Sequence, residues 1–333
     1  MKSISIALCT YNGAKYLQQQ LDSIADQTVL PGELVACDDG SSDETVEILK
    51  DFAEKAPFPV HIHINVSNLG VARNFEKCTS LCSGELIALC DQDDAWKPEK
   101  LEKLAEALNN KPEAGFVFCD AELVDENLTS LKRCLWDEKP NNFSHKERQG
   151  FAHSDQLPHL LKKNMVTGAC MMFRASLIPH IAPIPPSWIH DYWIATIAVA
   201  LDHRGIIVDE PLILYRQHKD QQIGILDGSN ISKLRASVSQ WPSLLQRDIN
   251  RAESLFNHLL DLEIGQDITD AVKQKIQFLA ARQRLLSSTR LARVVPGIKM
   301  LLEDFYQRFS PYGFQAFVMD LMCGETEAKR ITP

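Results

Sequence analysis

The chain has 333 residues, of which 45% are hydrophobic and 24% charged, and its formal net charge is −9. This composition is ordinary for a folded globular protein, and the excess of acids excludes a general nucleic-acid binder. The charge is uneven, because residues 231–333 carry 14 Lys and Arg against 11 Asp and Glu, whereas residues 1–230 carry 21 against 33. An acidic first part with a mildly basic second part is compatible with a cation-dependent enzyme that touches an anionic surface.

Strand-like and helix-like segments alternate along the first 120 residues. Short apolar runs predict the strands, and apolar residues at helical spacing predict the helices between them. This alternation indicates an α/β fold with a parallel sheet that helices cover on both faces. We expect strands at residues 4–9, 34–37, 60–65, 86–90 and 115–119. Helices are expected between Gly13 and Pro31, after a capping box formed by Ser41 and Glu44, at 71–81 and at 98–108.

Polar segments follow three of these strands. The first is Thr10-Tyr11-Asn12-Gly13, the second begins at Asp38-Asp39-Gly40, and the third contains Asp91, Asp93 and Asp94. In open sheets of this kind, ligands bind beyond the carboxyl ends of the strands. The glycine fingerprints of Rossmann dehydrogenases and of P-loop enzymes are both absent from the sequence.

The third segment places three carboxylates within four residues, directly after an apolar strand. Such charges repel one another unless a cation lies between them. Mg²⁺ binds oxygen ligands and commonly completes its coordination shell with substrate phosphates. The alternative is a solvated turn that caps the helix beginning at Lys97-Pro98, and the residues alone leave both interpretations open.

The regular alternation ends near residue 120. We expect a hairpin and a long loop over residues 121–153, a turn at 166–169 that leads into a strand, and a proline-rich linker at 179–186. Strands are expected at 206–208 and 212–215, and only helical patterns follow residue 230, with breaks at Gly265, Pro296 and Pro311. The domain boundaries predicted from this are 1–230, with halves of about 1–120 and 121–230, and a helical region at 231–333.

The nine cysteines form no Cys-x-x-Cys pair, and several lie within apolar runs. They are typical of buried free thiols in a reducing compartment. The sequence has neither the apolar core of a signal peptide nor an apolar run of 18 residues. We therefore expect a cytoplasmic protein, with peripheral attachment to the inner face of the cell membrane left open.

Five short motifs follow one another along the chain: Thr10-Tyr11-Asn12, Asp38-Asp39-Gly40-Ser41-x-Asp43, Asp91-x-Asp93-Asp94, His190-Asp191-x-Trp193 and Tyr215-Arg216-x-His218. Each motif is unspecific by itself. In this order, and after these elements, they resemble the motifs of family 2 glycosyltransferases with the GT-A fold, and the resemblance covers about residues 3–220. Within that family the chain looks most like bacterial rhamnosyltransferases of polysaccharide assembly.

The resemblance implies a GT-A type nucleotide-binding sheet with helices on both faces, followed by an all-helical C-terminal region. The implied donor is a sugar linked to dTDP or UDP, with dTDP-rhamnose as one candidate. Thr10 and Tyr11 would line the base pocket, Asp39 would accept a hydrogen bond from the base N3–H, and Asp91 would contact the ribose. For Asp39 an Asx-turn is the alternative. The implied donor-binding residues are Thr10, Tyr11, Asn12, Asp39, Arg73, Asp91 and Arg216.

The resemblance also assigns the metal and the base. Asp93 would bind Mn²⁺ or Mg²⁺ at the diphosphate, with His218 as a further ligand. Asp191 would remove the proton of the acceptor hydroxyl, and a single base fits inversion at the anomeric carbon. The alternative is that Asp191 caps its helix. The implied acceptor-binding residues are Trp188, Tyr192 and Trp193, which in the alternative belong to the core.

The helical region lies outside the resemblance. Its helices are expected to pack on the catalytic domain, to form a homodimer, or to contact anionic lipid where a lipid-linked saccharide acceptor would wait. Two other functions stay open. A sugar-phosphate nucleotidyltransferase would usually carry a glycine-rich, basic loop after the first strand, and a non-catalytic sugar-binding relative would not need Asp93 and Asp191.

Overall fold

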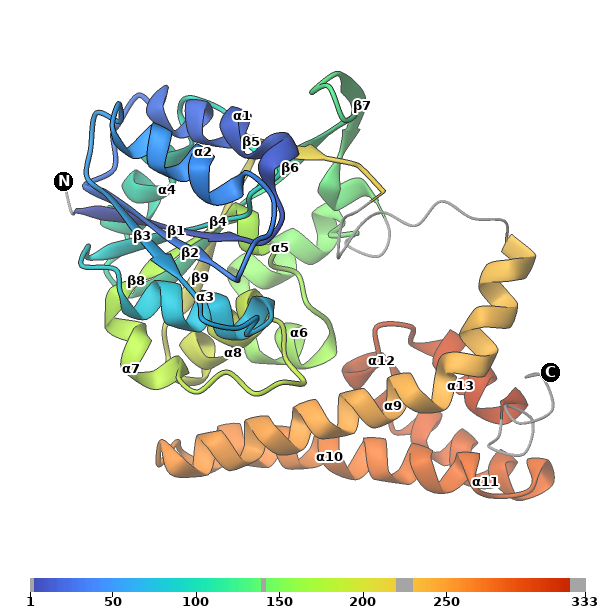
Figure 1. The fold of residues 1–333 in the computed structure, drawn as a ribbon. Helices are drawn as coiled ribbons and strands as arrows, with labels where there is room; N and C mark the ends of the chain where they lie inside the picture. Colours follow the sequence, from blue (N-terminus) through green and yellow to red (C-terminus); the bar gives the residue numbers. More distant parts are fainter. Residues whose placement is uncertain (1–2, 139–141, 220–229, 324–333) are drawn as a thin grey trace. The chain divides into compact units, whose positions relative to one another are not determined.

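The computed structural model describes residues 3–138, 142–219 and 230–323, and within residues 230–239 it describes the backbone alone. The chain divides into two compact units, one of residues 1–156 and 164–225 and the other of residues 157–163 and 226–333. The first unit contains the sheet, and the second consists of helices (Figure 1). Residues 157–163, which the sequence analysis placed in the acceptor half, group with the helical unit instead.

The first unit is built on one sheet with the strand order β3-β2-β1-β4-β8-β6-β9-β5, and β7 pairs with β6. Strands β1 to β4 pair in parallel, as predicted, so their carboxyl ends lie along one edge. The polar segments after β1, β2 and β4 are therefore brought together at that edge. The bounds are Ile4–Thr10 for β1, Glu33–Asp38 for β2, Val60–Ile64 for β3 and Leu86–Cys90 for β4.

Beyond β4 the sheet is mixed, which corrects the expectation of a purely parallel sheet. β8 (Met171–Arg174) is antiparallel to both β4 and β6 (Ala114–Val124). β9 (Arg204–Arg216) is parallel to β6 and forms one strand where two were expected. Hydrophobic runs reveal that a strand exists but carry no information about its direction, which explains the error. The short strands β5 (Ala95–Trp96) and β7 (Ser130–Cys134) are antiparallel to β9 and β6.

Helices cover both faces of the sheet (Figure 1). α1 (Ala14–Ala25) and α2 (Thr45–Ala53) lie on one side, and α3 (Val71–Ser80) and α8 (His190–Ala200) lie on the other. α1 buries Leu17, Leu21 and Ile24 completely, and each such side chain contributes about 1.5–3 kcal/mol of hydrophobic stabilisation. The unit also contains α4 (Lys100–Asn109), α5 (His145–His153), α7 (Ile178–Ile181) and the 3-10 turns η1 (Leu135–Asp137), η2 (Gly168–Cys170) and η3 (Ala175–Leu177).

All nine cysteines lie among the described residues and are free thiols, as expected. Over the described ranges, the chain contains no helix that is both long and apolar enough to cross a membrane.

The second unit is helical wherever the structure describes it. α9 (Asn230–Asp261) packs along α10 (Gln266–Leu286), and α11 (Arg290–Leu302), α12 (Phe305–Phe309), α13 (Phe314–Met322) and α6 (Leu157–Lys162) complete it. Gly265 and Pro311 lie between helices, as predicted, but Pro296 lies inside α11, so the break expected there is wrong. Proline removes one helical hydrogen bond, and the contacts of α11 with α10 and α13 hold the helix together despite that loss.

A buried carboxylate, Asp320 of α13, joins the elements of this unit. Its Oδ2 accepts hydrogen bonds from Arg282 Nε at 2.7 Å and the Tyr306 hydroxyl at 2.9 Å. Its Oδ1 accepts from Arg282 Nη2 at 3.0 Å and Trp241 Nε1 at 2.7 Å. Asp320 is fully buried and Arg282 nearly so, so the charge of each depends on the other.

We expect Asp320→Ala to destabilise the helical unit by about 3–5 kcal/mol, because it leaves the Arg282 guanidinium buried without a counter-charge. Urea unfolding followed by circular dichroism measures the change. The matched control is Glu303→Gln, which removes an exposed acid of the same unit whose ion pair with Lys299 spans 3.9 Å. That control is expected to stay within about 0.5 kcal/mol of wild type. An equal effect of both substitutions would contradict the role given to Asp320.

Candidate active site

Hydrogen bonds join the segments that follow β1 and β2. The Thr10 hydroxyl donates to Asp38 Oδ1 at 2.8 Å, and both side chains are buried. Asn12 has a φ of 49°, its amide N donates to Ser41 Oγ, and its side-chain oxygen accepts from Ser42 N, both at 2.8 Å. Thr10 and Asn12 therefore fix the shape of the edge, and their contact with the donor stays a prediction.

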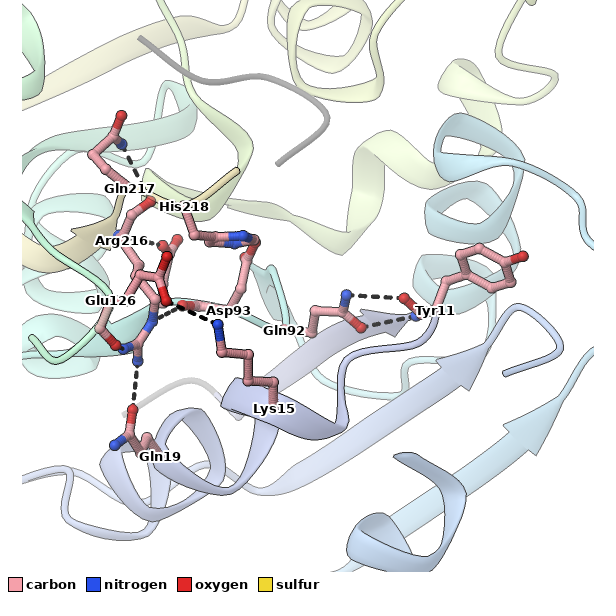
Figure 2. Close-up of polar contacts among 10 residues, drawn as sticks. Tyr11, Lys15, Gln19, Gln92, Asp93, Glu126, Arg216, Gln217 and His218 are labelled. Carbon is pink, nitrogen blue, oxygen red and sulfur yellow. Dashed lines mark hydrogen bonds and ion pairs between the residues drawn. The ribbon is translucent and has the colours of Figure 1, made fainter. Parts of the chain in front are cut away.

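The third segment is tied to the first by Gln92. Its side chain accepts from Tyr11 N at 2.8 Å and donates to Tyr11 O at 3.0 Å, so the backbone of Tyr11 is fixed while its side chain is exposed (Figure 2). A Cβ at Gly13 would lie 2.1 Å from Gln92 Oε1, so a side chain there would displace Gln92 from its contacts with Tyr11. The Tyr11 ring is thus available to stack on a flat ligand.

Asp39 lies buried behind this edge. Its Oδ1 accepts from Asn65 Nδ2 at 2.8 Å and Leu69 N at 2.7 Å, and its Oδ2 accepts from Gly70 N at 2.9 Å. A carboxylate offers about four acceptor sites, so three donors leave one for a ligand. These contacts place Asp39 between β2 and the loop that begins α3, and contact with a base stays a prediction.

Three acids of the Asp91–Asp94 segment have different surroundings. Burial and the negative charges of Asp93 and Asp191 raise the pKa of Asp91 to about 7. Burial and the charges of Asp93 and Asp91 raise the pKa of Asp94 well above its usual value. Asp94 Oδ1 accepts from Arg216 N at 3.0 Å, whereas its buried Oδ2 has no hydrogen-bond partner. The acids are close enough to repel one another, and Asp191 belongs to the same group.

Asp93 and His218 meet, although 125 residues separate them in the sequence. Asp93 Oδ2 lies 2.9 Å from His218 Nε2 (Figure 2). The imidazole packs on the Tyr16 ring with 4.7 Å between centroids. Among the described residues no group of three or more His, Cys, Asp and Glu could hold a metal ion, so this pair is the candidate. A carboxylate beside an imidazole, in a group with excess negative charge, fits a divalent cation that takes its other ligands from a substrate diphosphate and water.

Arg216 does not occupy the position predicted for a phosphate ligand. Its side chain is fully buried, its Nε donates to Asp93 O at 2.6 Å and its Nη2 donates to Gln19 Oε1 at 2.7 Å. Its Nη1 donates to Glu126 O (Figure 2). The guanidinium nitrogens donate to atoms of the protein itself and hold β9 against the Asp93 backbone. The prediction that Arg216 binds the sugar donor is therefore corrected, and its role is structural.

Arg73 lies on α3, with its Nη1 2.8 and 2.9 Å from the two carboxylate oxygens of Glu76. The arginine side chain is 44% exposed. The structure therefore pairs Arg73 with Glu76 and does not join it to the acids after β4, so contact with the donor stays a prediction.

Asp191 begins α8 with its carboxylate held from two sides. Oδ2 accepts from Gly168 N at 2.7 Å, and Oδ1 accepts from Tyr192 N at 2.5 Å and Asn164 Nδ2 at 3.2 Å. These hydrogen bonds fix the orientation of the carboxylate, and a general base must be held in position relative to the proton that it removes. A Cβ at position 168 would lie 2.7 Å from His190 Nε2, so only glycine allows this approach.

The aromatic residues around Asp191 are mostly core. Trp193 is fully buried and its Nε1 donates to Ile181 O at 2.7 Å, so its prediction as an acceptor-binding residue is wrong. Trp188 and Tyr192 are 6% and 5% exposed and pack on each other at 4.7 Å. Only small parts of these two rings reach the surface, and their contact with an acceptor stays a prediction.

Several residues of the site were missed in the sequence. Gln92 and Tyr16 lie within or beside the motifs, but a glutamine or tyrosine there has no distinctive spacing. Lys100 gave no signal as part of an ordinary amphipathic helix, although it is fully buried. Gly168 lies in the turn expected at residues 166–169, but nothing in the sequence connects that turn with Asp191.

Residues 5–181 match the family model described as glycosyl transferase family 2. The chain belongs to this family. The dTDP-rhamnosyl transferase RfbG of Shigella flexneri is 25% identical over 225 residues, which are 65% of this chain and 73% of RfbG. The uncharacterized protein Rv1520 of Mycobacterium tuberculosis is 27% identical over 65% of this chain, and the match spans only 59% of that relative.

Solved structures share the fold at low sequence identity. TarS 1-349 of S. aureus, in complex with UDP-GlcNAc, has a TM-score of 0.53 at 15% identity and covers 98% of this chain and 92% of its own. The mannosyltransferase PcManGT of Pyrobaculum calidifontis, in complex with GDP-Man and Mn²⁺, has a TM-score of 0.52 at 18% identity and covers 96% and 86%. They confirm the GT-A fold implied by the motifs, and divalent metals are common in enzymes with this fold.

Proposed function

We propose that this family 2 protein is an inverting, metal-dependent glycosyltransferase. It moves a sugar from a nucleoside diphosphate, dTDP or UDP, to a saccharide acceptor in the synthesis of a cell-surface polysaccharide. The name of the relative RfbG supports dTDP-rhamnose as the first donor to test. Complexes of TarS and PcManGT with nucleotide sugars support a donor of this class.

The observation that carries the proposal is the meeting of Asp91, Asp93 and Asp191 at one edge of the sheet. The charge of Asp191 acts on Asp91 strongly enough to contribute to its raised pKa. The proposed base therefore lies close to the segment proposed to hold the donor, which is what direct transfer of a sugar requires.

Asp93 and His218 would hold Mn²⁺ or Mg²⁺. When bound, the cation supplies positive charge that stabilises the diphosphate as it leaves. Three residues of the chain would bind the nucleoside part of the donor. Tyr11 offers a ring to the base, Asp39 an acceptor, and Asp91 an acceptor for the ribose hydroxyls.

At the other end, Asp191 takes the proton of the attacking acceptor hydroxyl. Gly168 and Asn164 hold its carboxylate in place, so that it needs no reorganisation before the step. His190 beside it is a weak proton acceptor, because burial lowers its pKa to about 3, and its ring is stacked on Phe75 with 3.9 Å between centroids. Proton removal is thus assigned to Asp191 alone, in agreement with inversion.

Thermal-shift measurements with a panel of nucleotide sugars, with and without Mn²⁺, test the donor class. A ligand that binds only the folded protein raises its melting temperature. We expect a dTDP- or UDP-sugar to raise it in the presence of Mn²⁺. No response to any nucleotide sugar would contradict the proposal.

We also propose that α11 places the enzyme at a membrane surface, where a lipid-linked acceptor would lie. The exposed fractions of Leu291, Val295, Ile298 and Leu302 are 88%, 75%, 42% and 82%, and their spacing puts them on one side of the helix. The sequence from 290 to 302 contains no acid, and Arg290 and Lys299 lie at either edge of this apolar stripe. An apolar stripe edged by cations is typical of a helix that lies in an anionic lipid interface.

A second copy of the chain fits this stripe less well than lipid does. A helix of 13 residues is about 20 Å long and about 10 Å wide, so that a dimer through it alone buries on the order of 200 Å² per copy. A stable interface buries about 800 Å² per partner.

We expect the protein to float with vesicles rich in phosphatidylglycerol and not with phosphatidylcholine vesicles. Leu291→Gln with Leu302→Gln is expected to lower the bound fraction at least about fivefold, because binding scales with the apolar area buried. The matched control, Leu260→Gln, alters a leucine of α9 that is 52% exposed. Flotation with neither vesicle type, or loss of a dimer in sedimentation of the double variant, would contradict lipid as the partner, and equal flotation with both types would contradict the preference for anionic lipid.

A further inference from the structure

A lysine that the proposed mechanism does not use lies fully buried beside the site. Lys100 is the first residue of α4, and its Nζ donates to Ala169 O at 2.7 Å. The same nitrogen lies 3.2 Å from the centroid of the Trp96 ring. A lysine is almost never fully buried unless its charge is compensated, so its place needs an explanation.

The surroundings of Lys100 connect the two ends of the site. Ala169 belongs to the turn η2, and its neighbour Gly168 donates its N–H to Asp191 Oδ2 at 2.7 Å. On the other side, the charge of Lys100 acts on Asp91 and Asp94 and lowers the pKa of each against the effect of burial. Burial lowers the pKa of Lys100 itself to about 8, which leaves it mostly protonated at neutral pH.

We propose that Lys100 is a positioning residue for the general base, because its ammonium fixes the Ala169 carbonyl and thereby the Gly168 N–H that holds Asp191. Lys100 touches neither donor nor acceptor in this account. The Ala169 carbonyl shares its peptide plane with the Cys170 N–H, which donates to Thr167 O at 2.9 Å. The Thr167 carbonyl in turn shares its peptide plane with the Gly168 N–H, so that an unrestrained Ala169 carbonyl would let both planes of this three-residue turn rotate. A misplaced base costs rate without weakening the binding of the donor.

The inference rests on the proposed function, and it predicts a separation of kinetic constants. Lys100→Met keeps the length of the side chain but removes its charge and its donors. We expect kcat to fall by about 10- to 100-fold while the KM for the nucleotide sugar changes less than about twofold. The matched control, Lys103→Met, removes a lysine of the same helix that is 37% exposed and pairs with Glu210, and it is expected to behave as wild type.

A double substitution separates positioning from general damage. If Lys100 acts through Asp191, then Lys100→Met adds little to the loss caused by Asp191→Asn, because the two residues act as one unit. Additive losses, or a donor KM that rises along with the fall in kcat, would overturn the proposal. If Lys100→Met does not fold, Lys100→Arg keeps the charge but donates through a planar fork, so we expect a smaller loss of kcat with an unchanged donor KM, and a donor KM that rises in this variant would overturn the proposal.

A measurement that does not depend on enzyme activity tests the role of Lys100 separately from the proposed function. In protein labelled with 15N-glycine, the Gly168 amide reports its hydrogen bond to Asp191. We expect this resonance to move in both Lys100→Met and Asp191→Asn and to stay in place in Lys103→Met. An unchanged Gly168 resonance in Lys100→Met would refute the positioning role, whereas a moved resonance in a protein that transfers no sugar would refute the function alone.

Discussion

Asp191→Asn is expected to lower the rate of sugar transfer by about 10²–10⁴-fold, the usual contribution of a general base, while the nucleotide sugar still binds. The asparagine side chain is nearly the same size as aspartate and keeps one oxygen to accept the Gly168 N–H. It cannot take a proton from an acceptor hydroxyl. Donor affinity by calorimetry and initial rates by product analysis measure the two quantities separately.

Asp202→Asn is the matched control for this substitution. Asp202 is exposed, lies two residues after the end of α8, and has a φ of 64°, a conformation that asparagine also adopts readily. We expect wild-type rates from it. Full transfer activity of Asp191→Asn would remove Asp191 as the base, and loss of donor binding in it would make the residue structural.

The second large effect is expected at the proposed metal pair. Asp93→Asn removes the carboxylate charge, and we expect it to weaken the joint binding of Mn²⁺ and nucleotide sugar by more than about 100-fold. Substitution of a residue that only hydrogen-bonds to a metal ligand typically lowers metal affinity about 10–100-fold, and loss of a ligand is expected to lower it further. His218→Ala is expected to give a smaller loss in the same direction. Calorimetric titration of the donor with and without Mn²⁺ measures both.

Asp209→Asn serves as control for Asp93, because Asp209 is a β9 acid that is 55% exposed and lies 3.3 Å from Arg148 Nε. Donor binding that is equally tight without a divalent cation, or unchanged in Asp93→Asn, would show that the Asp93 and His218 pair holds no metal. The 2.9 Å contact would then be an ion pair or hydrogen bond that closes the site.

Much of the first half of the fold could be predicted from local patterns. Buried runs such as residues 86–90 and the helical stripe of α1 identify the elements, and the parallel pairing of β1 to β4 follows from their crossover helices. The antiparallel insertion of β8 between β4 and β6 could not be predicted, because it depends on pairing between segments about 80 residues apart. The grouping of α6 with the helical unit could not be predicted either, because it also depends on contacts between segments far apart in the sequence.

The candidate site could also be predicted only in part. Acids at strand ends predicted the grouping around Asp91 and Asp93, and the family resemblance added Asp191 and His218, which the structure brings to the same edge. The wrong site predictions concern side chains that are buried. Arg216 and Trp193 are residue types that often bind phosphate and sugar, but here both form hydrogen bonds inside the protein. A motif gives residue type and order, whereas the direction in which a side chain points depends on packing.

The most direct test of sugar transfer is analysis of the products by mass spectrometry after incubation with a nucleotide sugar, a saccharide acceptor and Mn²⁺. The account predicts an acceptor that is heavier by one sugar residue, together with free nucleoside diphosphate, and neither product above background in Asp191→Asn. Release of pyrophosphate with formation of a nucleotide sugar, or an unmodified acceptor with every donor that binds, would contradict it.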